Sequence, residues 1–305
     1  MPAPDLLPWY VDQRLSLLGL VVLLVFALGT ELVVRGDALT RRVLLQRLRL
    51  YVLGALFGAV AIWAFTVQHR REARRTWGRP LHVAVVLLAQ GPLERPVVEA
   101  FQKGAARAST FIKQERARYE PKAGPSMYFH VFGPSRPAQA LPAPAGTSVL
   151  DRLTFRIALL RYLHAVDAAL DLPSDRFDER MYVLAKPPTT ERAPRFVEGI
   201  GEAGGEFGVI SVDLDLGMVE QAWIAVIHEV LHTLGANDKF DDEGHALVPE
   251  GLVEPRKVPP YPQRFAEIMV GELPLAPATG RLATGLSEVA VGALTAREIG
   301  WGAAR

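Results

Sequence analysis

The chain of 305 residues contains no cysteine. This absence excludes a disulfide framework, an iron–sulfur cluster and a zinc site with thiolate ligands, although it does not identify the redox compartment. Net charge is also nearly absent, because 34 basic side chains almost balance 33 acidic ones and leave +1 at neutral pH. No internal repeat is visible, so a repeat architecture is not expected.

The small net charge conceals a difference between two parts of the chain. Residues 1–80 contain eleven arginines and five acidic residues, a net charge of +6, which leaves −5 for residues 81–305. The longer part therefore has no basic stripe that could follow a phosphate backbone. We expect no nucleic-acid partner.

Hydrophobic residues make up half of the chain, and their excess lies near the N-terminus. The run 15–34 is apolar except for Ser16, Thr30 and Glu31, and the run 50–68 carries no charge. Each approaches the roughly 20 residues that a helix needs to cross a bilayer. A pair of buried core helices is the alternative, but arginine-rich flanks favour two transmembrane helices and hence contact with a lipid bilayer.

Arginines lie both between these two runs and directly after the second one. If both helices span, the positive-inside rule cannot place both arginine clusters in the cytoplasm. When the first helix takes precedence, the loop between the runs lies inside and the rest of the chain lies outside. The sequence therefore predicts a multi-pass membrane anchor over residues 1–80 and a folded domain over residues 81–305 on the extracytoplasmic side.

Residues 81–305 show alternating strand and helix patterns. Strands are predicted at 81–88, 127–132, 181–184 and 207–213, and helices at 97–119, 148–170 and 218–234. The last helix is apolar on most sides and should be buried. The glycines of 199–204 match a dinucleotide-binding pattern, but a strand follows them where that site needs a helix, so we expect a hairpin.

The buried helix contains His228-Glu229-Val230-Leu231-His232. Two histidines four residues apart share one helix face, about 5–6 Å between Cβ atoms, and can bind one Zn²⁺. Glu229 lies one step round, where a general base could face a zinc-bound water. Gly235 should end the helix, and the chain reversal there would bring Asp238 back as a third ligand. Three protein ligands leave a fourth position for water, as in catalytic zinc sites.

The run from His228 to Asp238 resembles the extended metzincin motif H-E-x-x-H-x-x-G-x-x-H/D, with aspartate last as in the snapalysin-type variant. The resemblance implies a zinc metallopeptidase that acts on peptide or protein substrates. It also implies a methionine turn below the metal, for which Glu267-Ile268-Met269-Val270-Gly271 is the candidate. Some metzincins carry a transition-state tyrosine two residues after that methionine, where this chain has Gly271.

The same resemblance assigns the strand 207–213 to the sheet edge beside the cleft, where it could pair with an extended peptide. Asp238 follows His228 by ten residues, as the metzincin spacing requires. Four other side chains compete for the role of third ligand: Asp241, Asp242, His245 and Glu254. The remaining histidines His82, His130 and His164 lie in apolar patterns and are interpreted as core residues.

We therefore predict an α+β fold, in which a zincin-like domain with a mixed sheet and an active-site helix follows two transmembrane helices. The predicted activity is zinc-dependent peptide hydrolysis, with Glu229 as general base and His228, His232 and Asp238 as ligands. Two alternatives remain. The chain could be a non-catalytic membrane protein whose domain binds metal structurally or serves as a binding module, or it could hydrolyse a bond other than a peptide. No feature of the sequence indicates an oligomeric state.

Overall fold

The computed structural model describes residues 38–124, 126–143, 146–187, 197–201 and 206–302. The chain divides into two compact units, Met1–Arg70 and Arg71–Arg305. Helix α2, Ala38–Arg75, contains the predicted second membrane run. Within it, Gln46–Arg75 is long and apolar enough to cross a membrane, with a mean hydropathy of 2.1 and no buried part in its most apolar window. The predicted first membrane run, 15–34, lies outside the described residues.

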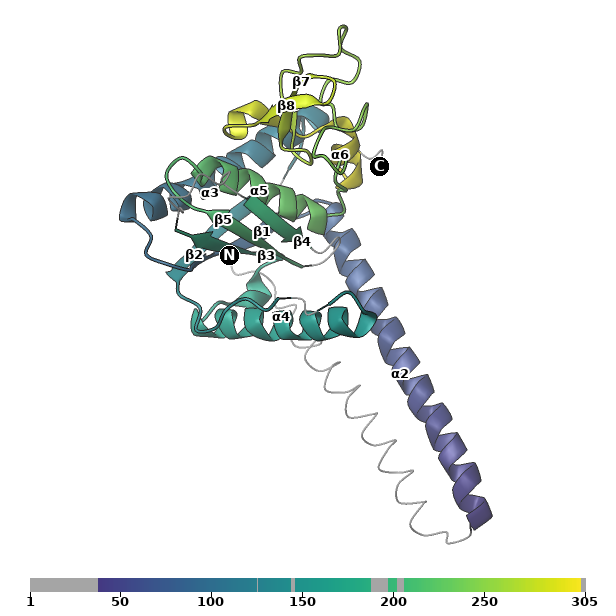
Figure 1. The fold of residues 1–305 in the computed structure, drawn as a ribbon. Helices are drawn as coiled ribbons and strands as arrows, with labels where there is room; N and C mark the ends of the chain where they lie inside the picture. The colour runs from purple at the N-terminus through teal and green to yellow at the C-terminus, as the bar shows by residue number, and fades with distance from the viewer. Residues whose placement is uncertain (1–37, 125, 144–145, 188–196, 202–205, 303–305) are drawn as a thin grey trace. The chain divides into compact units, whose positions relative to one another are not determined.

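A five-stranded sheet forms the centre of the second unit (Figure 1). Its strand order is β2-β1-β3-β5-β4, with β1 Leu81–Ala89, β2 Met127–Ser135, β3 Glu179–Lys186, β4 Val197–Gly201 and β5 Phe207–Asp213. The first four strands are parallel, and β4 pairs antiparallel with β5. Parallel strands are covered on both faces, which explains why β1 is an almost unbroken apolar run.

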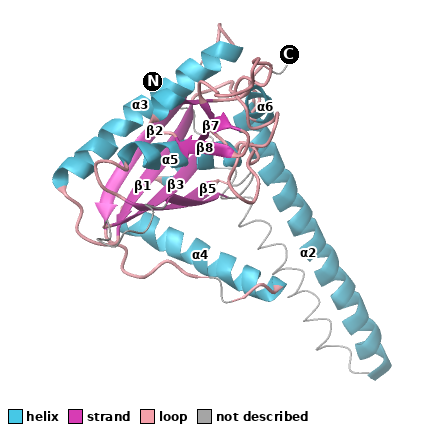
Figure 2. Ribbon diagram, turned by 45° about the horizontal axis from the view of Figure 1, so that its top comes forward, coloured by secondary structure: helices cyan, strands magenta, loops and turns pink. Residues whose placement is uncertain are grey.

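Helices cover both faces of this sheet (Figures 1 and 2). Helices α3, Arg95–Tyr119, and α5, Val219–Thr233, lie on one face, and α4, Val149–Ala169, lies on the other. Close packing between α3 and α5 depends on Gly104, because a Cβ there would lie 1.9 Å from Nε1 of Trp223. That indole also donates a 2.9 Å hydrogen bond to the Phe101 carbonyl, so α5 is fixed against α3.

Comparison with the sequence predictions gives two differences. The mixed sheet is confirmed, but helices on both faces of a mostly parallel sheet make the layering α/β, whereas we predicted α+β. The assignment of 207–213 to the sheet edge is wrong, because β4 pairs outside β5 and takes the edge position. The expected hairpin is confirmed by this antiparallel β4–β5 pair, whose connecting residues 202–205 lie outside the described chain.

Short elements make up the C-terminal part of the unit. They are β6 Ala266–Glu267, β7 Glu272–Ala276, β8 Thr279–Leu282, η2 Leu286–Glu288, β9 Val289–Ala290 and α6 Ala293–Glu298, while η1 Ser174–Arg176 precedes β3. Strand β6 pairs with β9, and β7 pairs with β8. Their sequences are too short to show a clear period of two or 3.6 residues, which is why sequence patterns did not predict them.

Residues 71–80, which the sequence pattern assigns to the anchor, contribute to the packing of the second unit. Arg74 is buried, with Nε 2.8 Å from an oxygen of the fully buried Glu179. Trp77 is also buried, and its indole donates a 2.7 Å hydrogen bond to the Ile299 carbonyl. The last turn of α2 and the residues after it therefore belong to the folded domain.

Candidate metal centre

Helix α5 ends where the motif predicts. Thr233 is its last residue, and Gly235 adopts a left-handed backbone with φ of 104°. The N–H of Gly235 donates to the His232 carbonyl at 2.9 Å, and the N–H of Ala236 donates to the Leu231 carbonyl at 2.9 Å. A residue without Cβ enters this conformation at little cost, so the helix stops and the chain turns back.

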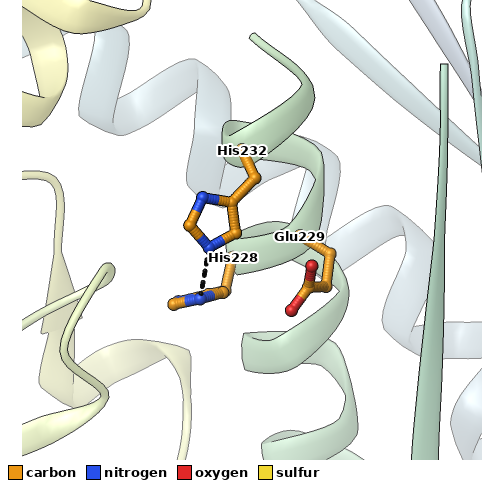
Figure 3. Close-up of side chains that lie close together, drawn as sticks. All are labelled: His228, Glu229 and His232. Carbon is orange, nitrogen blue, oxygen red and sulfur yellow. Dashed lines mark hydrogen bonds between the residues drawn. The ribbon is translucent and has the colours of Figure 1, made fainter. Parts of the chain in front are cut away.

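The reversal brings Asp238 next to both motif histidines. The Nε2 atoms of His228 and His232 lie 3.0 Å apart (Figure 3), and Oδ1 of Asp238 lies 3.2 Å and 3.1 Å from them. Tetrahedral zinc with ligand bonds of about 2.0–2.1 Å needs donor atoms about 3.3 Å apart. Two imidazoles and one carboxylate at this spacing therefore fit the donor set of a catalytic zinc site.

Backbone carbonyls orient both imidazoles. Nδ1 of His228 lies 3.0 Å from the Ile268 oxygen, and Nδ1 of His232 lies 2.8 Å from the Ala236 oxygen. Since a carbonyl only accepts, each Nδ1 carries a proton, which leaves each Nε2 to bind a metal ion when the ring is neutral or to donate to Asp238 when the ring is protonated. Carbonyls in this position commonly fix metal-binding histidines. Sequence reasoning missed both groups, because a backbone carbonyl has no signature in the sequence.

Glu229 lies beside the imidazoles and is buried (Figure 3). Its carboxylate forms a group with His228 and His232 in which the potential ligand atoms are within 4.8 Å of one another. The backbone of β5 approaches it closely at Gly208, where a Cβ would lie 3.3 Å from the Glu229 Cβ and 2.8 Å from Sδ of Met181. A glycine at this position therefore allows the sheet to cover the Glu229 side of α5.

Contacts within the cluster shift the pKa values of Asp238 and His232 in opposite directions. Burial acts to raise the pKa of Asp238, but hydrogen bonds from His228 and His232 lower that pKa far below its ordinary value. Burial acts to lower the pKa of His232, while the Asp238 carboxylate and the Ala236 carbonyl raise it overall. Asp238 consequently stays ionised at neutral pH, which is the form that binds a cation.

A carboxylate on α6 holds the loop that carries Asp238. Glu298 accepts a hydrogen bond from the Asn237 backbone N–H at 3.2 Å and from its side-chain amide at 3.3 Å. It also accepts from Nζ of the buried Lys239 at 2.7 Å. Both neighbours of Asp238 are therefore fixed to one side chain, a device that the sequence did not reveal because Glu298 is far away along the chain.

The predicted methionine turn lies next to His228. Buried Glu267 organises it, because its carboxylate accepts hydrogen bonds from the backbone of Met269 and Gly292 and from the Thr295 hydroxyl. The turn places the Ile268 carbonyl oxygen 3.0 Å from Nδ1 of His228. Gly271 has φ of 75°, which side-chain-bearing residues rarely adopt. The backbone thus disfavours a tyrosine at this position.

The rival ligands make different contacts. Asp241 accepts hydrogen bonds from the backbone N–H groups of Glu243 and His245 within its own loop. The His245 ring lies 3.2 Å from a carboxylate oxygen of Glu272. Among the described residues, the histidines and acids close enough to share an ion are His228, Glu229 and His232, and Asp238 joins them through its distances to both histidines. None of the four rivals belongs to this group.

The other histidines depart from the prediction that they are core residues. His130 and His164 are exposed, and His82 is partly exposed. Nδ1 of His82 lies 3.1 Å from Nε2 of His130 on the α4 side of the sheet. The apolar pattern misled the assignment of His164 because α4 carries a second apolar face that points to solvent.

Comparisons with known proteins give little beyond this geometry. No family model and no curated protein matches the chain. One similar structure is archaemetzincin from Methanopyrus kandleri, with 16% identity and a TM-score of 0.28 over 55% of this chain and 79% of that one. Another is a chaperone–substrate complex, with 11% identity and a TM-score of 0.28 over 53% of this chain. The match spans about a quarter of that chain, at 24%. At these TM-scores neither structure assigns a function.

Proposed function

We propose that the protein is a zinc-dependent metallopeptidase. The observation that carries the proposal is the triangle formed by two Nε2 atoms and Oδ1 of Asp238, with sides of 3.0–3.2 Å. His228, His232 and Asp238 would hold the ion. Bound zinc supplies Lewis acidity, which acidifies a water molecule and polarises a substrate carbonyl.

Glu229 is the general base of this proposal. Glu229 suits the role of general base because its carboxylate is close to both histidines. Asp238, by contrast, is the acid at ligand distance from both of them. The carboxylate accepts a proton from the attacking water, whose oxygen bonds to the carbonyl carbon. It then passes that proton to the leaving amine nitrogen as the C–N bond breaks, which returns Glu229 to its ionised form.

The edge strand β4 is the part of the sheet that could align a substrate. Helix α5 packs against both β4 and its partner β5, so an extended peptide added to β4 would lie at the edge of the sheet that the motif helix covers. Main-chain hydrogen bonds of this kind bind peptides with little dependence on sequence. We therefore infer a peptide substrate rather than a compact small molecule.

The test uses the full chain, purified in detergent. Zinc content and digestion of an unbiased peptide library are measured before chelation, after chelation and after zinc is restored, with His245→Ala as a matched histidine variant outside the cluster. We expect cleavage that is lost on chelation, returns with zinc and persists in His245→Ala. Stoichiometric zinc without cleavage of any peptide would instead favour a structural metal in a binding module, and a broader substrate screen would then look for another bond.

The anchor is a second part of the proposal. Helix α2 would span the membrane together with residues 15–34, which places the metallopeptidase domain outside the cytoplasm. Because the chain has no cysteine, Thr279→Cys provides a single labelling site on β8. In intact cells this variant should react with a membrane-impermeant maleimide. Labelling that requires cell lysis would place the domain in the cytoplasm.

A further inference from the structure

Helix α4 is apolar on two faces. One face packs under the sheet through Leu159, Tyr162, Leu163 and Val166. The second face is solvent-exposed, with side chains that are between 42% and 83% exposed: Val149, Leu150, Leu153, Ile157 and Leu160. At about 100° per residue these five side chains fall on a stripe about 100° wide, directed away from the buried face.

Arginines border this stripe on both sides. Arg156 lies along one border and Arg161 lies along the other, and both are exposed. The two acids of α4 are used elsewhere. Asp151 accepts hydrogen bonds in the cap with Ser148, and Asp167 is buried, where it accepts from Arg180 and Tyr182. The exposed face of α4 is thus apolar in the middle and cationic at both edges.

An exposed apolar stripe of this kind marks a surface that is covered in use. Its cationic borders select an anionic partner, and long arginine side chains can reach outward to phosphate groups while their stems lie along apolar surface. A second copy is disfavoured, since two stripes face to face would bring their arginine borders together. The same chain also contains α2, which is long and apolar enough to cross a bilayer.

We propose that α4 lies in the interface of a lipid bilayer that contains anionic lipids. The stripe defined by Val149, Leu150, Leu153, Ile157 and Leu160 enters the acyl-chain boundary, and the arginines meet the phosphate groups. This contact is separate from the metal centre, because α4 covers the face of the sheet opposite to α5. It goes beyond the proposed peptidase activity and does not depend on it.

The experiment uses the full chain in nanodiscs, with a single environment-sensitive fluorophore. Leu153→Cys places the label in the stripe, and Ala158→Cys places it on the same helix, exposed but outside the stripe. Lipids brominated on their acyl chains should quench the label at position 153 severalfold more than the label at 158. The difference should appear with phosphatidylglycerol and shrink in pure phosphatidylcholine.

Charge removal gives an independent readout. Arg156→Gln and Arg161→Gln should each lower the equilibrium constant for membrane contact by about fivefold, as expected for one cation near an anionic surface. Equal quenching at positions 153 and 158, with free access of aqueous iodide to 153, would overturn the proposal. Shielding of position 153 from both iodide and brominated lipid would also overturn it, because protein would then cover the stripe.

Discussion

Replacement of Glu298 tests whether the metal centre depends on groups that do not touch the ion. Its carboxylate lies on α6 and holds Asn237 and Lys239, the two neighbours of Asp238. Glu298→Ala removes this support and leaves all three proposed ligands and Glu229 unchanged. Glu298→Gln retains hydrogen-bonding capacity but removes the charge that faces Lys239.

The size of the effect follows from the burial of the pair. The Lys239 side chain is 3% exposed and Glu298 is 20% exposed. Truncating one partner of a buried ion pair costs about 3–5 kcal/mol, and we expect the lower end, about 3 kcal/mol, because water can reach Glu298 and Lys239 keeps its bond to the Asn237 carbonyl. Zinc affinity should fall by about 10- to 100-fold, the range for residues that orient metal ligands.

The assay measures two quantities for each variant: thermal unfolding of the metal-free protein, and zinc affinity by competition with a chromophoric chelator. Glu288→Gln is the matched control, because Glu288 forms an ion pair with the exposed Arg281 and is not one of the groups that hold Asn237 or Lys239. Glu298→Gln should lose less stability than Glu298→Ala yet still bind zinc more weakly than wild type. If Glu298→Ala binds zinc with wild-type affinity, the loop does not need this support and the reasoning fails.

Three further predictions concern the same domain. Burial raises the pKa of Glu179 to about 8 against the opposing effect of Arg74, so the folded state holds this proton while the unfolded state, near 4.5, has lost it. The resulting stabilisation is complete below pH 4.5 and is lost as the pH rises to about 8, by at most about 1.4 kcal/mol per pH unit. Glu179→Gln should remove this pH dependence of the free energy of unfolding, measured by chemical denaturation. The same pH dependence in the variant and the wild type would contradict the assignment. Gly235→Ala should lower the free energy of unfolding by about 1–2 kcal/mol in the same assay, because φ is 104° at this position and a Cβ is strained there. Unchanged stability in this variant would contradict the expected strain. Asp238→Ala should lower zinc stoichiometry while His245→Ala does not, and full occupancy in Asp238→Ala would transfer the role of third ligand to another residue.

Much of the fold near the metal centre follows from sequence patterns. Strand 207–213 and helix 218–234 were predicted within one residue of β5 and α5, because a buried apolar run and a 3.6-residue period are strong local signals. The edge position of β4 was missed, since its few glycine-rich residues carry no strand pattern and strand order depends on pairing over long distances.

The candidate centre divides in the same way. His228, His232 and Asp238 were predicted to come together, because helix periodicity and a glycine-ended helix fix their relative positions within eleven residues of chain. The carbonyl of Ile268 and the carboxylate of Glu298 reach the centre from distant segments. Such contacts depend on the packing of β6, β9 and α6, and those elements are too short to recognise by pattern.

The most direct test of the central claim is a single substitution, Glu229→Gln, measured for both zinc content and peptide hydrolysis. Glutamine keeps the shape of the side chain but cannot accept the proton from water. The account predicts zinc content and melting temperature near those of wild type, with hydrolysis reduced by at least about 10²-fold. Peptide hydrolysis at the wild-type rate in this variant would contradict the proposed mechanism, whatever the metal content.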